Sequence, residues 1–111
     1  MRKVLAVFAI VLMAMGTLGA QTKTAKKIKI GFANINERSA FTKMVRNGIE
    51  TEAKKRGWDI ICLDNASDGA TAVRNADDLI TQKIDYMIEF NVDGSVAPVI
   101  MEKFNAAKIP V

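Results

Sequence analysis

Histidine is missing from this 111-residue chain, and cysteine occurs once. Without histidine, neither a serine nor a cysteine nucleophile has the imidazole base that the common catalytic triads use. One cysteine cannot form an internal disulfide, and one cysteine without histidine cannot supply a metal cluster. Cys62 stands between Ile61 and Leu63, so we expect it to be a buried core thiol. Triad chemistry and a metal centre are therefore not expected, and no cofactor is predicted.

A phosphate-binding glycine loop is missing as well, because Gly31-Phe32-Ala33 lacks the spacing of the dinucleotide and nucleotide fingerprints. An even spread of basic charge is also missing. Six of the sixteen basic residues precede residue 30, which leaves ten basic against twelve acidic residues in the remaining body. The basic excess is therefore an N-terminal feature, and it gives no support to nucleic-acid binding.

The N-terminus has the three-part layout of a secretory signal peptide. Arg2 and Lys3 precede an apolar run over residues 4–15, and small residues follow over 16–20. The run is too short to span a bilayer comfortably, although a membrane anchor or a buried N-terminal helix is the alternative. We predict a signal peptide over 1–20, cleaved after Ala20 or after Gly19, and a polar leader over 21–27. No stable membrane insertion is expected after cleavage.

Apolar runs alternate with helical periodicity through the rest of the chain. Strands are expected over 28–33, 58–63 and 86–90, and helices over 41–56, 72–80 and 96–107, with a fourth strand opening at 109–111. Strands that alternate with helices of this length favour right-handed crossovers and a parallel sheet covered on both faces. The predicted fold class is therefore α/β, a doubly wound parallel sheet in three layers.

Helix boundaries are marked by familiar residue types. Basic residues at 54–56 suit the negative end of the first helix, and Gly57 is a natural stop. Pro98 is acceptable only in the first turn of the third helix, where backbone amides have no intrahelical partner. Asp93 or Ser95 is expected to cap that helix.

In doubly wound sheets, ligands bind outside the carboxyl ends of the strands. That rule selects the loops 34–41, 64–69 and 91–95 as the candidate site. They carry amides, carboxylates, a guanidinium and one aromatic ring, which suits a polar ligand better than acid–base catalysis by Asp64 and Asp93. The candidate ligand-binding residues are Asn34, Arg38, Phe41, Asp64, Asn91 and Asp93.

Each candidate has a plainer interpretation. Asp93 can accept hydrogen bonds from two adjacent sugar hydroxyls, or it can simply cap a helix. Phe41 can lie against an apolar sugar face, or it can be the first core residue of its helix. Asp64 and its neighbour Asn65 are common turn formers. Arg38 forms a solvated pair with Glu37 or contacts the ligand.

Five segments together resemble a known family. They are Lys29-Ile30-Gly31-Phe32, the helix end from Gly48 to Trp58, the loop 64–68, the strand 85–90, and the stretch from Asn91 through Asp93 to Val111. Their order and spacing resemble the N-terminal domain of type 1 periplasmic binding proteins, the ribose/galactose/xylose-type sugar-binding proteins of ABC importers. The resemblance implies that Asp93 contacts sugar hydroxyls. It also implies ring stacking near 39–42, where Phe41 alone remains of the family's aromatic pair.

The resemblance further implies a two-lobed protein that holds its ligand between the lobes. Residues 28–111 would then be an incomplete N-terminal lobe, truncated at the fourth strand. The implied function is the exported, periplasmic solute-binding component of a carbohydrate ABC importer, with a sugar and the membrane permease as partners and no enzymatic activity. A periplasmic receptor for a sugar-like signal, feeding a chemoreceptor or a sensor kinase, is the alternative. An enzyme on the same fold is a weaker one. The identity of the sugar stays open.

Overall fold

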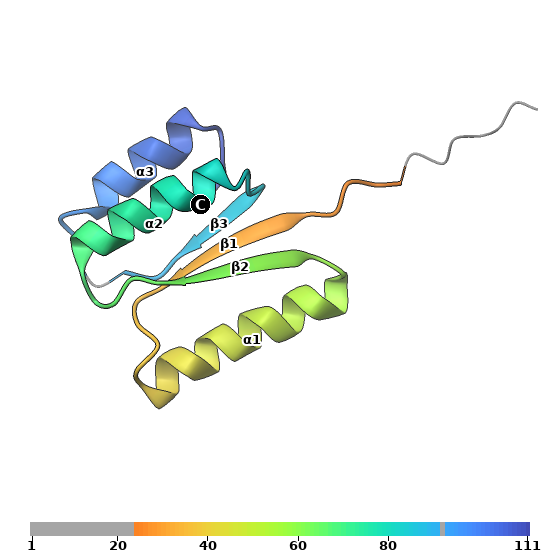
Figure 1. The fold of residues 1–111 in the computed structure, drawn as a ribbon, viewed down its shortest axis with the longest axis horizontal. Coiled ribbons are helices and arrows are strands. Elements are labelled where there is room, and N and C mark those ends of the chain that lie inside the picture. The colour runs from red at the N-terminus through yellow and green to blue at the C-terminus, as the bar shows by residue number, and fades with distance from the viewer. Residues whose placement is uncertain (1–23, 92) are drawn as a thin grey trace, which may run out of the picture.

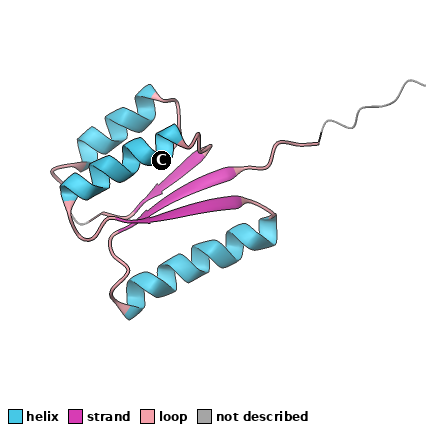
Figure 2. Ribbon diagram, viewed as in Figure 1, coloured by secondary structure: helices cyan, strands magenta, loops and turns pink. Residues whose placement is uncertain are grey.

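The computed structural model describes residues 24–91 and 93–111, so the predicted signal peptide lies outside the described residues (Figure 1). Three strands and three helices alternate along this part of the chain, as the sequence predicts (Figure 2). The elements are β1 (Lys29–Asn34), α1 (Ala40–Arg56), β2 (Asp59–Asp64), α2 (Gly69–Thr81), β3 (Tyr86–Glu89) and α3 (Ala97–Ala106). Residues 24–27 precede β1 without regular structure, and they are exposed.

The three strands form a parallel sheet in the order β2-β1-β3. β1 is therefore the central strand, with Ile30 opposite Ile60 on one side and opposite Tyr86 on the other. Helix α1 covers one face of the sheet, and α2 and α3 lie together on the other (Figure 1). The predicted three-layer, doubly wound architecture is confirmed. Asn34 and Asp64 close their strands instead of opening the loops.

Helix α1 begins and ends at residues suited to those positions. The Ser39 hydroxyl accepts a hydrogen bond from the Thr42 amide at 3.1 Å and so caps the first turn. At the other end Gly57 has φ 69°, a left-handed conformation that glycine adopts without steric cost, and its amide bonds the last carbonyls. The predicted stop at Gly57 is confirmed.

Helices α2 and α3 begin differently. Asp68 caps α2, because its carboxylate accepts from the Thr71 amide at 2.7 Å. Helix α3 has Val96 at the capping position and no side-chain cap, so the predicted cap by Asp93 or Ser95 is wrong. The Asp93 carboxylate turns instead to Ser95, within the loop itself. Pro98 lies in the first turn, as predicted.

The face under α2 and α3 is closed by a continuous apolar core. Its buried members include residues of β1, β3, α2 and α3, and partly buried residues of β2 pack against them. Phe104, Leu79 and Ile100 are among the largest fully buried side chains. Gly31 lets α2 and the segment after it approach β1 closely, since a Cβ at this position would lie 3.1 Å from Leu79 Cδ2 and 2.7 Å from Ile84 Cδ1. This close packing fixes the helices over the sheet.

The face under α1 is covered only in part. Phe32 is fully buried there, but Tyr86 and Ile88 of β3 are 48% and 38% exposed. Beside α1 the surface is hollowed into an apolar groove of about 350 Å³, lined by Ile28, Ile30, Trp58, Tyr86 and Ile88. Helix α1 lies mainly against β2 and leaves β3 open on this side.

Each helix returns toward the sheet through one residue in the left-handed conformation. Gly57 takes this role after α1, Lys83 (φ 56°) after α2 and Lys108 (φ 57°) after α3. After Lys108, Ile109 is buried and the carbonyl of Pro110 accepts a hydrogen bond from the Met87 amide at 2.9 Å. The last residues therefore lie beside β3, but 109–111 have no regular structure, so the predicted opening of a fourth strand is not seen in the described residues.

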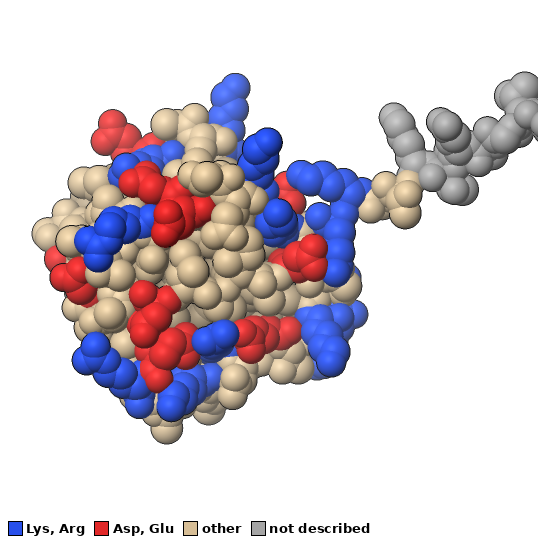
Figure 3. Space-filling model, in the orientation of Figure 1, with Lys and Arg blue, Asp and Glu red and all other residues tan. Residues whose placement is uncertain are grey.

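Charged side chains of both signs are interspersed over the face drawn in Figure 3. Two lysines before the sheet pair with carboxylates next to it, Lys26 with Asp85 and Lys27 with Asp59, each at 2.6 Å. None of the helices within residues 24–91 and 93–111 is long and apolar enough to cross a membrane.

Candidate functional site

The loops that follow the three strands meet at one edge of the sheet, as expected for parallel strands. Backbone hydrogen bonds join them. The Asn65 amide donates to the Asn34 carbonyl at 2.8 Å, and the Ser67 amide donates to the Ile35 carbonyl at 2.7 Å. On the other side, the Phe90 amide donates to Ala33 at 2.9 Å. The first two predicted loops are therefore joined directly, and the third follows β3, which pairs with β1.

Side chains add a second set of links between the β1–α1 and β2–α2 loops. The Asn36 amide donates to the Ser67 hydroxyl at 3.1 Å, while its carbonyl accepts from the Arg38 backbone amide at 2.9 Å. Ala66 and Ser67 both have left-handed conformations, with φ near 54° and 56°, which is costly for residues with a Cβ. These contacts hold the β2–α2 loop in a strained shape.

Asp64 takes part in that turn. Its carboxylate accepts a hydrogen bond from the Ala66 amide at 2.7 Å, while the side chain stays exposed. The turn-forming interpretation of Asp64 is therefore confirmed, and a ligand contact by the same carboxylate stays a prediction.

Asp93 lies in the loop between β3 and α3, beside the start of α2. Its Oδ1 accepts from the Ser95 hydroxyl at 2.6 Å and from the Ser95 amide at 2.9 Å. These two hydrogen bonds hold the pKa of the Asp93 carboxyl below its usual value, the hydroxyl contributing most. The second oxygen, Oδ2, lies close above Gly69, where a Cβ would come within 2.6 Å of it. Asp93 is thus an ionised acceptor at neutral pH, placed against the start of α2.

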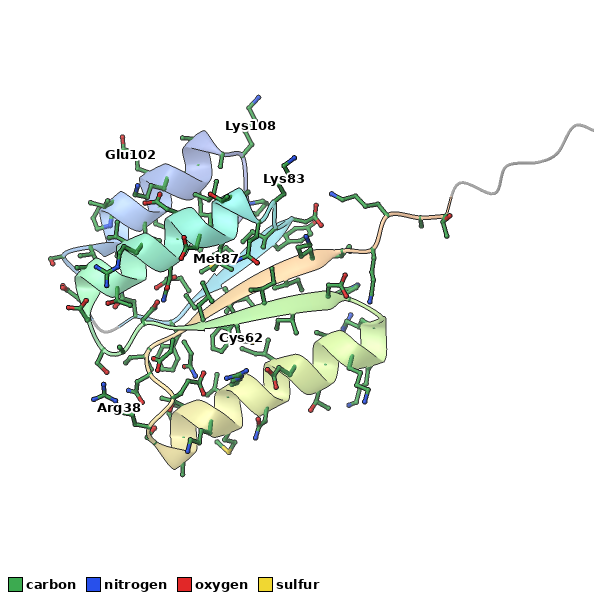
Figure 4. The ribbon with its side chains drawn as sticks, viewed as in Figure 1. Arg38, Cys62, Lys83, Met87, Glu102 and Lys108 are labelled. Carbon is green, nitrogen blue, oxygen red and sulfur yellow. The ribbon has the colours of Figure 1, made fainter. Side chains whose placement is uncertain are left out.

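Phe41 and Arg38 lie on the outer side of the edge. Phe41 is 57% exposed, so it is not the core residue that the plainer interpretation expects. Its ring meets Phe90 edge to face, with 6.4 Å between the centroids. Arg38 lies at the amino-terminal end of α1 and is exposed (Figure 4). The predicted pair of Arg38 with Glu37 is wrong, since Glu37 faces Arg46 at 3.4 Å.

Asn34 and Asn91 lie deeper than expected. Asn34 has no exposed surface. Its side-chain amide donates to the Glu37 carboxylate at 2.9 Å and to the Thr42 backbone carbonyl at 3.1 Å. In this structure it holds the β1–α1 loop, and a ligand contact by Asn34 stays a prediction. The side-chain oxygen of Asn91 accepts a hydrogen bond from the Asp93 backbone amide at 3.1 Å, so Asn91 helps to orient Asp93.

Two residues at the edge were not among the sequence candidates. Asn65 is fully buried and donates to Glu89 Oε1 at 2.9 Å. Glu89 is half-buried, and this burial raises the pKa of its carboxyl to about 7. The sequence held one signal for it, because Glu89 is the charged residue inside the apolar run from Tyr86 to Phe90.

Cys62 lies on the sheet face toward α1 (Figure 4). It is only partly buried, which corrects the predicted core thiol, because α1 crosses this face without sealing it. Burial raises the pKa of the Cys62 thiol to about 11, and a hydrogen bond with Glu50 adds to the effect. The thiol therefore stays protonated at neutral pH. Across the described ranges, no three histidine, cysteine or carboxylate side chains are grouped as metal ligands.

Comparisons with known proteins bear on the family and the fold. A model of the periplasmic binding protein domain matches residues 30–111. The ribose import binding protein of Bacillus subtilis (strain 168) is 33% identical over 86 residues, which is 78% of this chain and 28% of that protein. The chain thus spans less than a third of its curated relative.

Solved structures give the same picture. An ABC transporter solute-binding protein from Mycobacterium smegmatis with bound glycerol superposes with a TM-score of 0.72 at 25% identity, over 76% of this chain and 29% of that one. One from Actinobacillus succinogenes 130z with bound D-allose gives 0.69 at 23% identity, over 76% and 30%, and so supports the fold.

Proposed function

The chain belongs to the periplasmic binding protein family, and from this premise we propose that it is the first part of an exported sugar-binding protein of a carbohydrate ABC importer. The observation that supports this most directly is the position of the Asp93 carboxylate at the carboxyl edge of the parallel sheet. Neighbouring relatives bind ribose or carry bound glycerol, as their names state. The periplasm as location and the membrane permease as partner belong to the same proposal.

Asp93 would contact the sugar as an ionised acceptor. A carboxylate has two oxygens with four lone-pair directions, so adjacent hydroxyls can donate to it at the same time. Ser95 already occupies part of Oδ1, which fixes the plane of the group and keeps it ionised. The carboxylate is therefore preorganised before the sugar arrives, which lowers the entropic cost of binding.

Phe41 would supply the apolar contact. Its ring is more than half exposed, and the edge-to-face contact with Phe90 limits its orientations. Arg38, exposed at the same end of α1, would add hydrogen-bond donors to the rim of the site. The two side chains come from the β1–α1 segment and Asp93 comes from the β3–α3 loop, so the ligand would be held between loops.

The remaining contacts would come from the rest of the protein. The chain covers 28% of its curated relative, so a second lobe would form the opposing wall of the site. We therefore expect the 111-residue chain to bind D-ribose at least about 100-fold more weakly than the complete protein, because half of the contacts are missing. Isothermal titration of both proteins against D-ribose, D-allose and myo-inositol measures this. Equal micromolar affinity in the two would contradict the proposal.

Asp93→Asn in the complete protein tests the site itself. Losing a charged acceptor for hydroxyl groups should weaken sugar binding by about 10- to 100-fold, since such hydrogen bonds contribute about 1.5–3 kcal/mol. Asp77→Asn is the matched control, because Asp77 lies on the surface of α2 and pairs with Lys103. If the sugar affinity of the Asp93 variant equals that of the control, Asp93 is not a ligand residue.

A further inference from the structure

Glu89 ends β3 in a setting unusual for a carboxylate. Its Oε1 accepts one hydrogen bond, from the Asn65 side chain at 2.9 Å. Its Oε2 is buried and has no hydrogen-bond partner within the described residues. A buried acceptor without a partner is costly, and more so when it is charged. The contact with Asn65 therefore matters more than an ordinary surface hydrogen bond.

Asn65 joins the exits of all three strands. Its backbone amide donates to the carbonyl of Asn34, at the end of β1. Its side-chain amide donates to Glu89 at 2.9 Å and approaches the Phe90 carbonyl at 3.4 Å, both at the end of β3. Its carbonyl oxygen accepts from Asn75 of α2 at 2.8 Å. One fully buried amide thus sets the spacing between the loops of the candidate site.

The charged groups of the neighbouring segments do not compensate Glu89. The carboxylates around the edge are bonded within their own loops, Asp64 to Ala66, Asp68 to Thr71 and Asp93 to Ser95. On the helices, cations have partners elsewhere, Arg74 with Thr71 and Lys103 with Asp77. The ionisable groups of these packed elements are Asp64, Asp68, Arg74, Asp77, Asp78, Asp93, Glu102 and Lys103, and β1 offers none from Ile30 to Asn34.

We propose that Glu89 is a positioning residue that acts through Asn65, so that its protonation state sets how firmly the three loops of the site are held together. An ionised carboxylate makes a shorter and stronger hydrogen bond with the Asn65 amide than a neutral carboxyl does. The loops are therefore fixed more firmly when Glu89 is ionised. For sugar binding this inference rests on the proposed function, but the loop coupling itself does not.

Stability and loop order should respond to pH in opposite directions. The pKa of Glu89 is raised from 4.5 in the unfolded chain to about 7 in the fold, chiefly by burial, while the Asn65 hydrogen bond lowers it. The stabilising contribution of the protonated group is thus complete below about pH 4.5 and is lost as pH rises toward 7. The Asn65 contact, in contrast, strengthens over the same window. If Glu89 had a merely structural role, stability and the strength of the Asn65 contact would not change with pH in opposite directions.

Nuclear magnetic resonance of the 111-residue chain tests the coupling without any sugar. The Glu89 carboxyl carbon and the Asn65 side-chain amide should titrate together, with a midpoint near 7. Glu89→Gln keeps an acceptor for Asn65 and removes the titrating proton, so it should abolish the transition at Asn65. Glu37→Gln is the matched control, because Glu37 also accepts from an asparagine amide at 2.9 Å, and it should leave the transition intact.

A reversed pair gives an independent check. Asn65→Asp places a second carboxylate against Glu89 and should lower the melting temperature most at high pH. Adding Glu89→Gln restores a donor and an acceptor across the same contact, with the direction reversed, and should recover the melting temperature. A Glu89 midpoint near 4.5, an Asn65 signal that ignores pH between 5 and 8, or no recovery in the double variant overturns the inference.

The complete protein then links the coupling to the ligand. Its affinity for D-ribose should rise about 2.5-fold to fivefold between pH 6 and pH 8, the linkage expected when binding lowers the Glu89 pKa by about half a unit to one unit. In Glu89→Gln the change should stay under about twofold. Absence of binding to D-ribose, D-allose and myo-inositol at every pH would refute the proposed function and leave the resonance result standing. Binding with no pH dependence would overturn this link.

Discussion

The two faces of the sheet differ in how completely helices cover them. Under α2 and α3, the side chains of five elements interlock, and Phe104 and Leu79 have no exposed surface. Under α1, the same strands leave Tyr86 and Ile88 partly exposed beside an apolar groove. One helix can cover only part of a three-stranded sheet, and α1 lies mainly along β2. The stability of the described domain should therefore reside mainly on the closed face.

Phe104→Ala should give the largest effect. Removing a fully buried aromatic ring from the closed face should lower the free energy of unfolding by about 3–5 kcal/mol. Met101→Ala on the same helix is the control, because Met101 is 39% exposed and should cost under about 1 kcal/mol. Urea denaturation measures both. A similar loss in the two variants would mean that the closed face is less tightly packed than described.

Gly31→Ala should act through the same face with a smaller effect. The added methyl group would meet Ile84 and Leu79 at 2.7 to 3.2 Å, and such overpacking costs about 1–3 kcal/mol. Gly48→Ala in α1 has no neighbour within 4 Å and should instead stabilise by about 0.5–1 kcal/mol. Thermal unfolding followed by circular dichroism shows the two signs. A stabilised Gly31 variant would contradict the tight packing described for the face under α2 and α3.

Tyr86→Thr on the open face should change least. Tyr86 is already 48% exposed, and threonine also has a high strand propensity. The substitution should therefore lower the free energy of unfolding by under about 1 kcal/mol. Its neighbour Met87 faces α2 and is 3% exposed, so Met87→Thr should cost at least about 2 kcal/mol (Figure 4). Two adjacent residues of one strand thus test both faces in a single urea experiment. Equal losses in the free energy of unfolding would show that side chains on the groove side contribute as much stability as those on the closed face.

Much of the fold could be predicted from the sequence because its signals are local. Gly57 marks the end of α1, Pro98 marks the first turn of α3, and strand–helix alternation implies a parallel sheet with its ligand edge. The exposure of Phe41 could not be predicted the same way. Its spacing fits the apolar face of a helix, but the sheet ends before it can cover the start of α1.

The candidate site was predicted as a location more reliably than as a set of contacts. The loops after β1 and β2 are joined by hydrogen bonds, and Asp93 of the third loop lies against Gly69 at the start of α2. Whether a polar side chain faces outward depends on its partners, which lie eight residues apart for Asn34 and Thr42 and twenty-four apart for Asn65 and Glu89. No local pattern encodes such pairs, and so Asn34 was expected at the surface and Asn65 was expected only as a turn former.

The three left-handed residues that follow the helices differ in their steric cost. Gly57 adopts this conformation without a steric penalty, but Lys83 and Lys108 carry a Cβ into it. Both lysines lie at the amino ends of the strands, away from Arg38 and the ligand edge (Figure 4). The molecule therefore keeps two strained turns where they serve no contact of the candidate site. An engineer could relax them with glycine to make a sturdier scaffold while leaving every ligand-facing loop as it is.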